Sequence, residues 1–293
     1  VPVMAVAHLA EAGHNPIIII GGGTARIGDP SGKTEMRKML SVEQINEYGE
    51  NFKRQIANVL ATRNVEPMFV DNAEWLTELN YIDFLRDIGR HFSVNRMLSF
   101  EAYKQRLENG LSFIEFNYQL LQSYDFLVLN ERYNCKLQIG GDDQWGNIVA
   151  GTDLIRRVRG AETYGLTFPL VTRADGKKMG KTEQGAVFVA PELMGPYEFF
   201  QYWRNVPDAD VIRFLKLYTF LPMEEIHKLS GLSGREINHA KEVLATEITR
   251  MVHGDAEAKQ AVEASKAAFG GAEEGDTSAI PQMEVSRSDL ESG

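Results

Sequence analysis

The chain has 293 residues, 43% of them hydrophobic and 25% charged, which are the proportions of an ordinary globular protein with room for one large domain or two modest ones. Its net charge of −10 argues against a protein built chiefly to grip nucleic acid. No apolar run is long enough to cross a bilayer, and a single cysteine, Cys135, excludes an intrachain disulfide framework and suits a reducing cytoplasm.

The first predicted elements are a helix and a buried strand. Residues 3–9 predict the helix, and Gly13 supplies the glycine that commonly ends one. The run Ile17–Ile20 is short, β-branched and apolar on both faces, which is typical of a central strand in a parallel sheet. A helix leading into such a strand predicts an α/β fold.

A long glycine-lined loop follows, over residues 21–33. It ends in Gly-Lys-Thr, but a Walker phosphate-binding loop needs a glycine five residues before Gly32, and Ile27 stands there. A P-loop NTPase is therefore excluded. The Rossmann dinucleotide fingerprint also fits poorly, because no helical pattern begins promptly after the glycines.

This loop still carries chemistry-bearing side chains. A carboxylate at a strand end, Asp29, suits an ammonium group, and Lys33 and Arg37 suit a phosphate. The pair Asp29-Pro30 could equally begin an ordinary turn.

The next segment predicts further helices and a strand. Ser41 begins a long amphipathic helix through about Leu60. Residues 65–70 predict a second strand and residues 81–91 another helix, while residues 92–98 form a connector of ambiguous structure.

Residues 112–125 predict a helix with a polar stripe. Tyr118, Gln122 and Asp125 are spaced i, i+4 and i+7, so they share one face. A phenol, an amide and a carboxylate in one stripe can line a polar pocket. A solvated helix face has the same spacing, and the spacing alone leaves both interpretations open.

The most informative turn is residues 138–147, between a predicted buried strand (135–139) and a predicted helix (145–158). Its two glycines permit close approach of a ligand, and Gln144 and Asn147 supply convergent polar groups. In an open α/β sheet, ligands bind beyond the carboxyl ends of the strands, which is where this turn would lie. Taken alone, it could also be a Gly-rich turn with an Asp helix cap.

A further predicted strand, residues 166–172, leads into a basic segment over residues 173–183, which we call the lysine loop. It could be a solvated hairpin, as most charge runs are. Alternatively it brings lysines to a polyphosphate, where Lys181 and Thr182 would stabilise a leaving pyrophosphate.

The pattern then predicts helices only, and it fixes the expected domain organisation. We expect a catalytic domain over residues 1–190, a helical subdomain over 191–269 and an acidic linker or disordered tail over 270–293. The helices are predicted over residues 196–203, 209–219, 223–229, 233–252 and 255–269.

Together these stretches resemble the bacterial-type tyrosyl-tRNA synthetases, which are class I aminoacyl-tRNA synthetases. The resemblance runs from Val1 to about Phe269, and its motifs occur in the family's order. The matching segments are Gly28-Asp-Pro-Ser-Gly-Lys33, Phe92-Ser-Val-Asn95, Tyr118 with Gln122 to Asp125, Gly140 to Asn147, and Pro169 to Thr172 with Lys178-Met-Gly-Lys-Thr182.

The resemblance implies a Rossmann-like catalytic domain that joins tyrosine to ATP, releases pyrophosphate and passes tyrosine from tyrosyl-adenylate to tRNA(Tyr). It implies Mg²⁺ as the partner of ATP, no prosthetic group, a cytoplasmic location without a membrane partner, and a homodimer with Phe113 as a contact.

The resemblance also implies residue roles. Asp29, Tyr118 and Gln122 would hold the tyrosine ammonium group, Asp125 would accept a hydrogen bond from the phenol, and Gln144 would contact the carboxyl group.

The remaining implied roles concern ATP. Gly141, Asp143 and Lys181 would bind it, with Asp143 on the ribose. Lys178, Lys181 and Thr182 match the family's KMSKS-like loop (178–182), in which Gly180 and Thr182 are variants. Lys33 and Arg37 match basic residues of a second mobile loop.

Two parts of the family's pattern are absent from this sequence. In the family, the HIGH-type ATP-binding signature and a tyrosine that shares phenol recognition lie before the residue that matches Val1. An S4-like RNA-binding domain lies in the family where the acidic tail of this chain stops. We therefore expect the chain to be a fragment. The alternatives are a tryptophanyl-tRNA synthetase, which Asp125 and the pair Tyr118 and Gln122 disfavour, and a non-catalytic binding or dimerisation partner, which the lysine loop disfavours.

Overall fold

The computed structural model of the chain describes residues 1–27, 40–99, 103, 107, 110–174, 176, 179–182 and 185–269, without the side chains of 181, 182, 185 and 269. The chain divides at Leu170 into two compact units. The lysine loop falls in the second unit by this division, whereas the sequence places it with the first. The domain boundaries at 190 and 269 stay predictions.

The first unit alternates helices and parallel strands, as the sequence predicts. Its larger elements are α1 (Pro2–Glu11), β1 (Ile17–Ile20), α3 (Val42–Ala61), β2 (Met68–Asp71), α8 (Phe113–Tyr133), β3 (Leu137–Gly141), α9 (Trp145–Arg159) and β4 (Tyr164–Phe168). Its short helices are α2 (Gly22–Ala25), α4 (Ala73–Leu76), α5 (Tyr81–Asp87) and α6 (Val94–Met97), with 3₁₀ turns at Gly89–His91 and Asp142–Gln144.

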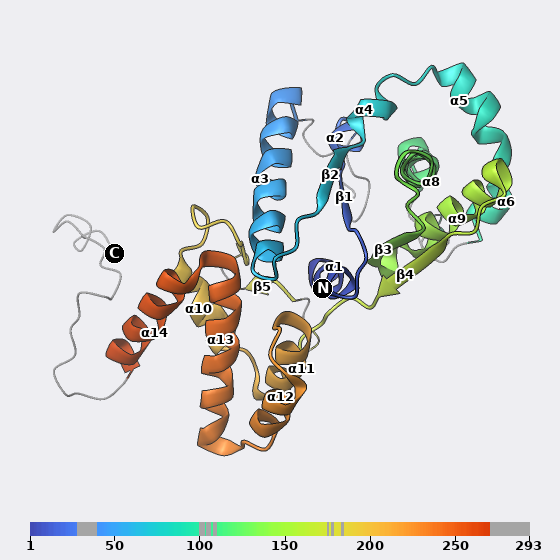
Figure 1. Ribbon diagram of the computed structural model, residues 1–293. Coiled ribbons are helices and arrows are strands. Elements are labelled where there is room, and N and C mark those ends of the chain that lie inside the picture. Colours follow the sequence, from blue (N-terminus) through green and yellow to red (C-terminus); the bar gives the residue numbers. More distant parts are fainter. Residues whose placement is uncertain are drawn as a thin grey trace. The chain divides into compact units, whose positions relative to one another are not determined.

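The strands form parallel pairs. Ile17 to Ile20 of β1 pair in register with Met68 to Asp71 of β2, and Leu137 to Gly141 of β3 pair with Tyr164 to Phe168 of β4. Both strands of a parallel pair end at the same edge, so α2 and α4, which follow β1 and β2, lie together there (Figure 1). This arrangement confirms the predicted α/β fold class.

Local sequence explains where the long helices begin and end. The side chains of Ser41 and Ser112 each accept a hydrogen bond from the backbone N–H of the residue three positions later. The side chains of those residues, Gln44 and Glu115, accept in return from the backbone N–H of the serine, which makes two capping boxes. Helix α8 ends at Tyr133 and is capped by Asn134, whose φ of 53° is in the left-handed region.

Prolines explain where two strands differ from the prediction. β2 begins at Met68 rather than at residue 65, directly after Pro67, and β4 ends at Phe168, directly before Pro169. Proline has no N–H to donate to the hydrogen bonds between strands, so it limits the pairing at the start of β2 and at the end of β4. The ambiguous connector contains α6, and the helix predicted over 81–91 stops at Asp87, just before Gly89.

Helices α8 and α9 pack closely, and this packing places the polar face of α8. A Cβ on Gly151 of α9 would lie 3.1 Å from the Phe126 ring of α8, so a larger residue would push the helices apart. Phe126, Ile148 and Ile155 are fully buried around this contact.

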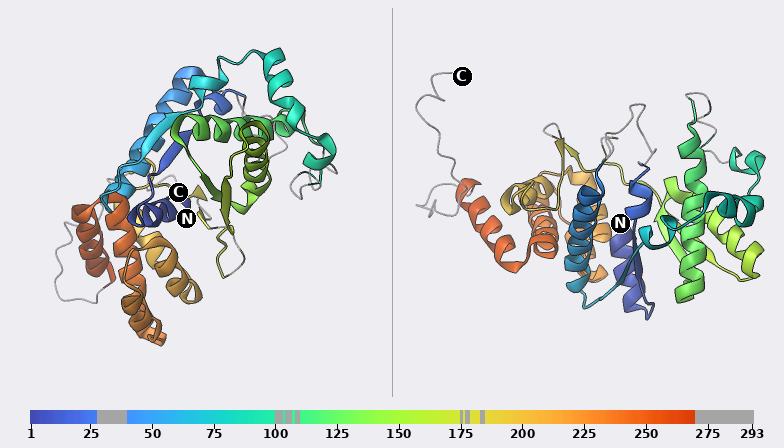
Figure 2. Two further views of the ribbon diagram at one scale, coloured as in Figure 1. Left: turned by 45° about the vertical axis from the view of Figure 1, so that its right-hand side comes forward. Right: turned by 90° about the horizontal axis from the view of Figure 1, so that it is seen from above.

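The second unit consists mainly of helices around one apolar core. They are α10 (Pro196–Arg204), α11 (Asp208–Tyr218), α12 (Met223–Ser230), α13 (Ile237–His253) and α14 (Asp255–Phe269), with a 3₁₀ turn at Gly234–Glu236. Figure 2 shows α13 beside α10 and α14. Phe199, Phe200, Phe214 and Leu215 are almost fully buried in the core.

The lysine loop ends in a short antiparallel hairpin, in which β5 (Lys181–Thr182) pairs with β6 (Gly185–Ala186). Among the described residues, none of the helices combines the length and the apolar character needed to span a bilayer.

Candidate active site

The site begins at the edge where β1 and β2 end. Asn72 directly follows β2 and is 2% exposed, and its Oδ1 accepts the N–H of Gly23 at 2.8 Å and of Thr24 at 3.4 Å. Asp71 Oδ1 accepts the N–H of Gly22 at 3.1 Å. A Cβ on Gly22 would lie 2.5 Å from both Asp71 oxygens, so the close approach of α2 requires glycine there.

The centre of this network is Asp125, on the inner face of α8 and only 5% exposed. Trp75 Nε1 donates to Oδ1 at 2.7 Å, and Asn72 Nδ2 donates to Oδ2 at 3.0 Å. Trp75 is itself buried, so neither donor is exchanged freely for water. A carboxylate has about four acceptor positions, so these two donors leave capacity for another hydroxyl or N–H.

Burial sets the protonation behaviour of Asp125. Burial raises the pKa of its carboxyl to about 6, the hydrogen bonds from Asn72 and Trp75 oppose this rise, and the nearby charge of Asp71 adds to it. The two forms are therefore equally populated at about pH 6, and at neutral pH the ionised form, which the two donors favour, predominates.

A second network joins α8 to the turn after β3. Asn147 Nδ2 donates to Gln122 Oε1 at 2.9 Å and to Gln144 Oε1 at 3.3 Å. Gln144 Nε2 in turn donates to Asp143 Oδ2 at 2.8 Å. The amide of Gln122 is therefore linked, through Asn147, to the amide and carboxylate of the Gly-Gly-Asp-Asp-Gln turn.

The turn itself is shaped by glycine. A Cβ on Gly141 would lie 2.4 Å from Asp143 Oδ1, so any side chain there would displace the carboxylate. Nearby, Gln119 Nε2 donates to the carbonyl of Gly146 at 2.8 Å and fixes the start of α9 against α8.

The structure brings several of the predicted residues together. Tyr118, Gln122 and Asp125 lie on α8, with Asp125 buried and the other two half-buried, and Gln144 and Asp143 reach Gln122 through Asn147. This linkage favours a pocket-lining face over a plain solvated one, and the individual roles stay predictions.

Other predicted residues cannot be placed. Asp29, Lys33, Arg37 and Lys178 lie outside the described residues, and Lys181 and Thr182 are described only as backbone in β5.

Asn72 and Trp75 were not predicted from the sequence as partners of Asp125. One signal was available for Asn72, since it lies two residues after a predicted strand that would be parallel to the first, where polar groups converge. The sequence around Trp75 gave no such signal, because a tryptophan is usually interpreted as a residue of the hydrophobic core.

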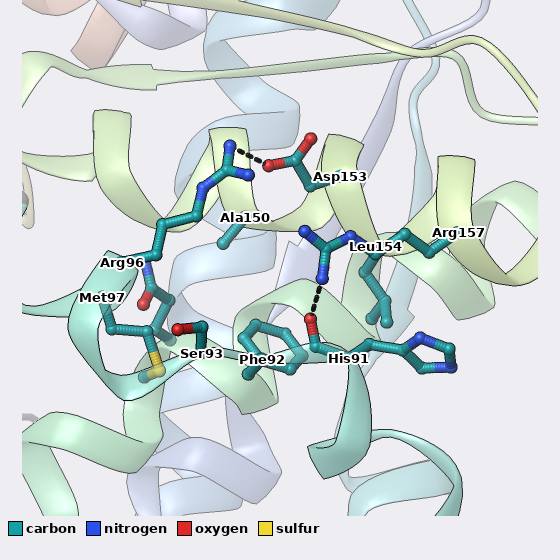
Figure 3. A pocket seen from close by; sticks show the side chains of 10 residues that line it. His91, Phe92, Ser93, Arg96, Met97, Ala150, Asp153, Leu154 and Arg157 are labelled. Carbon is teal, nitrogen blue, oxygen red and sulfur yellow. Dashed lines mark hydrogen bonds and ion pairs between the residues drawn. The ribbon is translucent and has the colours of Figure 1, made fainter.

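A small cavity lies beside α6, α8 and α9, with Gln119 in its lining (Figure 3). At about 30 Å³ it holds roughly one water molecule. Arg96 forms an ion pair with Asp153 there, and Arg157 donates to the carbonyl of His91. These pairings satisfy Arg96, Asp153 and Arg157, and the volume of the cavity is too small for an amino acid or a nucleotide.

Comparison with known proteins gives consistent matches. The family described as tRNA synthetases class I (W and Y) matches residues 1–270. The tyrosine–tRNA ligase of Treponema denticola is 58% identical over 293 residues, which is all of this chain and 71% of that protein. The tyrosine–tRNA ligase of Clostridium botulinum is 55% identical over 287 residues, covering 98% of this chain and 70% of that protein.

A solved structure of a related protein has the same fold. The C-terminally truncated mitochondrial tyrosyl-tRNA synthetase of Aspergillus nidulans superposes with a TM-score of 0.76 at 25% sequence identity, covering 88% of this chain and 78% of that one.

Proposed function

Because the chain belongs to the class I tRNA synthetases of the tryptophan and tyrosine type, we propose that it activates L-tyrosine with ATP and transfers it to tRNA(Tyr). The choice of tyrosine rests on Asp125, a buried carboxylate held by Asn72 and Trp75 with acceptor capacity to spare. A phenol can fill that capacity. Phenylalanine would leave the spare acceptor position of the buried carboxylate unfilled and shielded from water, and this family is itself a standard case of such discrimination.

The reaction needs placement and positive charge rather than acid–base chemistry. The tyrosine carboxylate is itself the nucleophile: it bonds to the α-phosphorus of ATP while the bond to the leaving pyrophosphate breaks. Catalysis then consists of in-line positioning and stabilisation of negative charge on the phosphates. Lys178, Lys181, Thr182, Lys33 and Arg37 supply that stabilisation in our proposal, with Mg²⁺ accompanying ATP.

In this proposal, the network around Asp125 and the network that joins Gln122 to Gln144 recognise different groups of the tyrosine substrate. Tyr118 and Gln122, together with Asp29, receive the ammonium group, and Asp125 receives the phenol. Gln144 contacts the carboxyl group.

The glycine turn binds the nucleotide. Asp143 takes the adenylate ribose, and Gly141 permits the close approach that ATP needs. The bridge from Asn147 to Gln122 and Gln144 supports this division, because it orients an ammonium-binding and a carboxyl-binding amide with a single donor group.

Amino-acid-dependent exchange of pyrophosphate into ATP tests this function. We expect strong exchange with tyrosine and far weaker exchange with tryptophan or phenylalanine, and we expect Lys181→Ala to abolish the exchange with tyrosine. Lys228→Ala, which removes an exposed lysine of α12, is the matched control and should exchange normally. Exchange driven by tryptophan would make the chain a tryptophanyl-tRNA synthetase, and equal loss in both variants would remove the lysine loop from the mechanism.

We further propose a cytoplasmic homodimer. Phe113 and Ile114, at the start of α8, are 69% and 46% exposed, so they are accessible for the contact that the family resemblance implies. Sedimentation of the wild-type chain should give a dimer, and Phe113→Glu should shift it towards the monomer. A wild-type monomer at micromolar concentration would contradict this proposal.

A further inference from the structure

The base of the lysine loop is tied to α11 by two side chains. Asp210, 1% exposed, accepts the backbone N–H of Ala174 through Oδ2 at 2.7 Å. Its other oxygen, Oδ1, accepts from Arg213 Nη2 at 2.7 Å. The same guanidinium nitrogen donates to the carbonyl of Thr172. The backbone is thus held at two points, two residues apart.

The remainder of the described loop is also anchored within the second unit. The N–H of Met179 donates to the carbonyl of Val171 at 3.3 Å, and the N–H of Val187 donates to the carbonyl of Gly180 at 2.9 Å. The side chain of Met179 packs against the helical core, and its sulfur accepts from Tyr202 Oη at 3.4 Å.

An acidic residue in the first turn of a helix, paired with an arginine three positions later, often serves only the helix. Glu247 and Arg250 form a comparable acid–arginine pair three residues apart, near the end of α13 rather than in its first turn, and Arg250 is 49% exposed against 44% for Arg213. Asp210 differs in two respects. It is buried, and it bonds the backbone of a segment 36 residues away.

Burial makes this arrangement specific. A buried carboxylate is tolerated only when its oxygens are paired, because removal from water is otherwise too unfavourable. Asp210 is satisfied by Arg213 and by the N–H of Ala174 together, so the chain favours the one backbone position that supplies both. Arg213 is steadied in turn by the ring of Phe214, 5.2 Å from its guanidinium carbon.

We propose that Asp210 and Arg213 are positioning residues, which clamp the base of the lysine loop at Thr172 and Ala174 and thereby support the part of this loop in the activation step. The inference rests on the proposed function, since it concerns the activation step. It assigns the clamp no contact with substrate.

The first test measures the loop itself. Arg213→Gln breaks the clamp, and Arg250→Gln breaks the matched ion pair that does not involve the loop. Hydrogen–deuterium exchange of the peptide spanning residues 171–180 should be faster in Arg213→Gln by about tenfold or more, the loss of one to two hydrogen bonds. It should be unchanged in Arg250→Gln. Equal exchange in the two variants would overturn the clamp.

The second test measures the reaction. We expect Arg213→Gln to lower kcat/KM for ATP in pyrophosphate exchange by about tenfold or more, since a misplacement of about 1 Å can lose on the order of a hundredfold. The dissociation constant for tyrosine, measured by calorimetry without ATP, should stay within about twofold. Arg213→Lys, which keeps the charge and one donor, should recover part of the loss. A parallel loss of tyrosine affinity would mean general disruption and would contradict a positioning role.

The two proposals fail in different ways. If the wild-type chain gives no tyrosine-dependent exchange, the proposed function fails and the positioning role fails with it. If the wild type exchanges and Lys181→Ala does not, but Arg213→Gln behaves like Arg250→Gln, only the clamp fails.

Discussion

Replacing Trp75 by phenylalanine removes one donor from Asp125 while keeping a large aromatic ring in the core. The indole N–H lies 2.7 Å from Oδ1, and Trp75 is 4% exposed, so water does not readily replace it. A hydrogen bond to a charged acceptor contributes about 1.5–3 kcal/mol. Its loss disfavours the ionised form of Asp125 by that amount.

The consequence is a change in the pH dependence of tyrosine binding. Since 1.36 kcal/mol corresponds to one pH unit, the midpoint governed by Asp125 should move upward by roughly 1–2 pH units. Burial already holds the pKa of this group at about 6, so Trp75→Phe should weaken tyrosine binding at neutral pH and recover it in mildly alkaline buffer.

The assay is calorimetric titration of tyrosine between pH 5 and about pH 9, with Trp203→Phe as the control. Trp203 is also a buried tryptophan, but its indole nitrogen has no hydrogen-bond partner among the described residues. Its replacement should leave the profile unchanged. Identical profiles for the two variants would refute the view that Trp75 supports the charge of Asp125.

Three further predictions follow from the geometry. Asn147→Ala should weaken tyrosine binding by roughly fivefold, the loss of about 1 kcal/mol, because Gln122 and Gln144 lose their shared donor; unaltered affinity in the calorimeter would contradict this. Gly180 has a φ of +83°, so Gly180→Ala should strain the lysine loop by about 1–2 kcal/mol and slow pyrophosphate exchange without changing tyrosine affinity. The pKa of Asp125 rises from 3.8 unfolded to about 6 folded, so the folded state binds the proton more tightly. The contribution of this proton to the free energy of unfolding is complete below about pH 4, and about 3 kcal/mol of it should be lost as the pH rises through about 6. Denaturant titrations at several pH values should show this fall in the wild type and not in Asp125→Asn.

The sequence predicts those parts of the fold that depend on local chemistry. The capping boxes at Ser41 and Ser112 act within one helical turn, so the starts of α3 and α8 can be recognised from the chain alone. The strand limits at Pro67 and Pro169 also follow from local sequence, since proline has no N–H to donate. The prediction followed the apolar pattern instead and therefore extended both strands across the prolines.

The partners of Asp125 could not be predicted in the same way. Asn72 and Trp75 are about fifty residues from it in sequence, and their contact depends on how α8 packs against the end of β2. Periodicity placed Asp125 on a face with Tyr118 and Gln122, but it could not show what that face packs against. The clamp at Asp210 was equally hidden, since its partner is a backbone group 36 residues away.

The most direct test is the preference for tyrosine over phenylalanine, measured as the ratio of their kcat/KM values in pyrophosphate exchange, for the wild type and for Asp125→Asn. If the buried carboxylate recognises the phenol, the wild type should strongly prefer tyrosine, and the ratio should fall at least tenfold in the variant, about 1.4 kcal/mol or more. An unchanged ratio would contradict the assignment of Asp125 and, with it, the account of how this chain selects its amino acid.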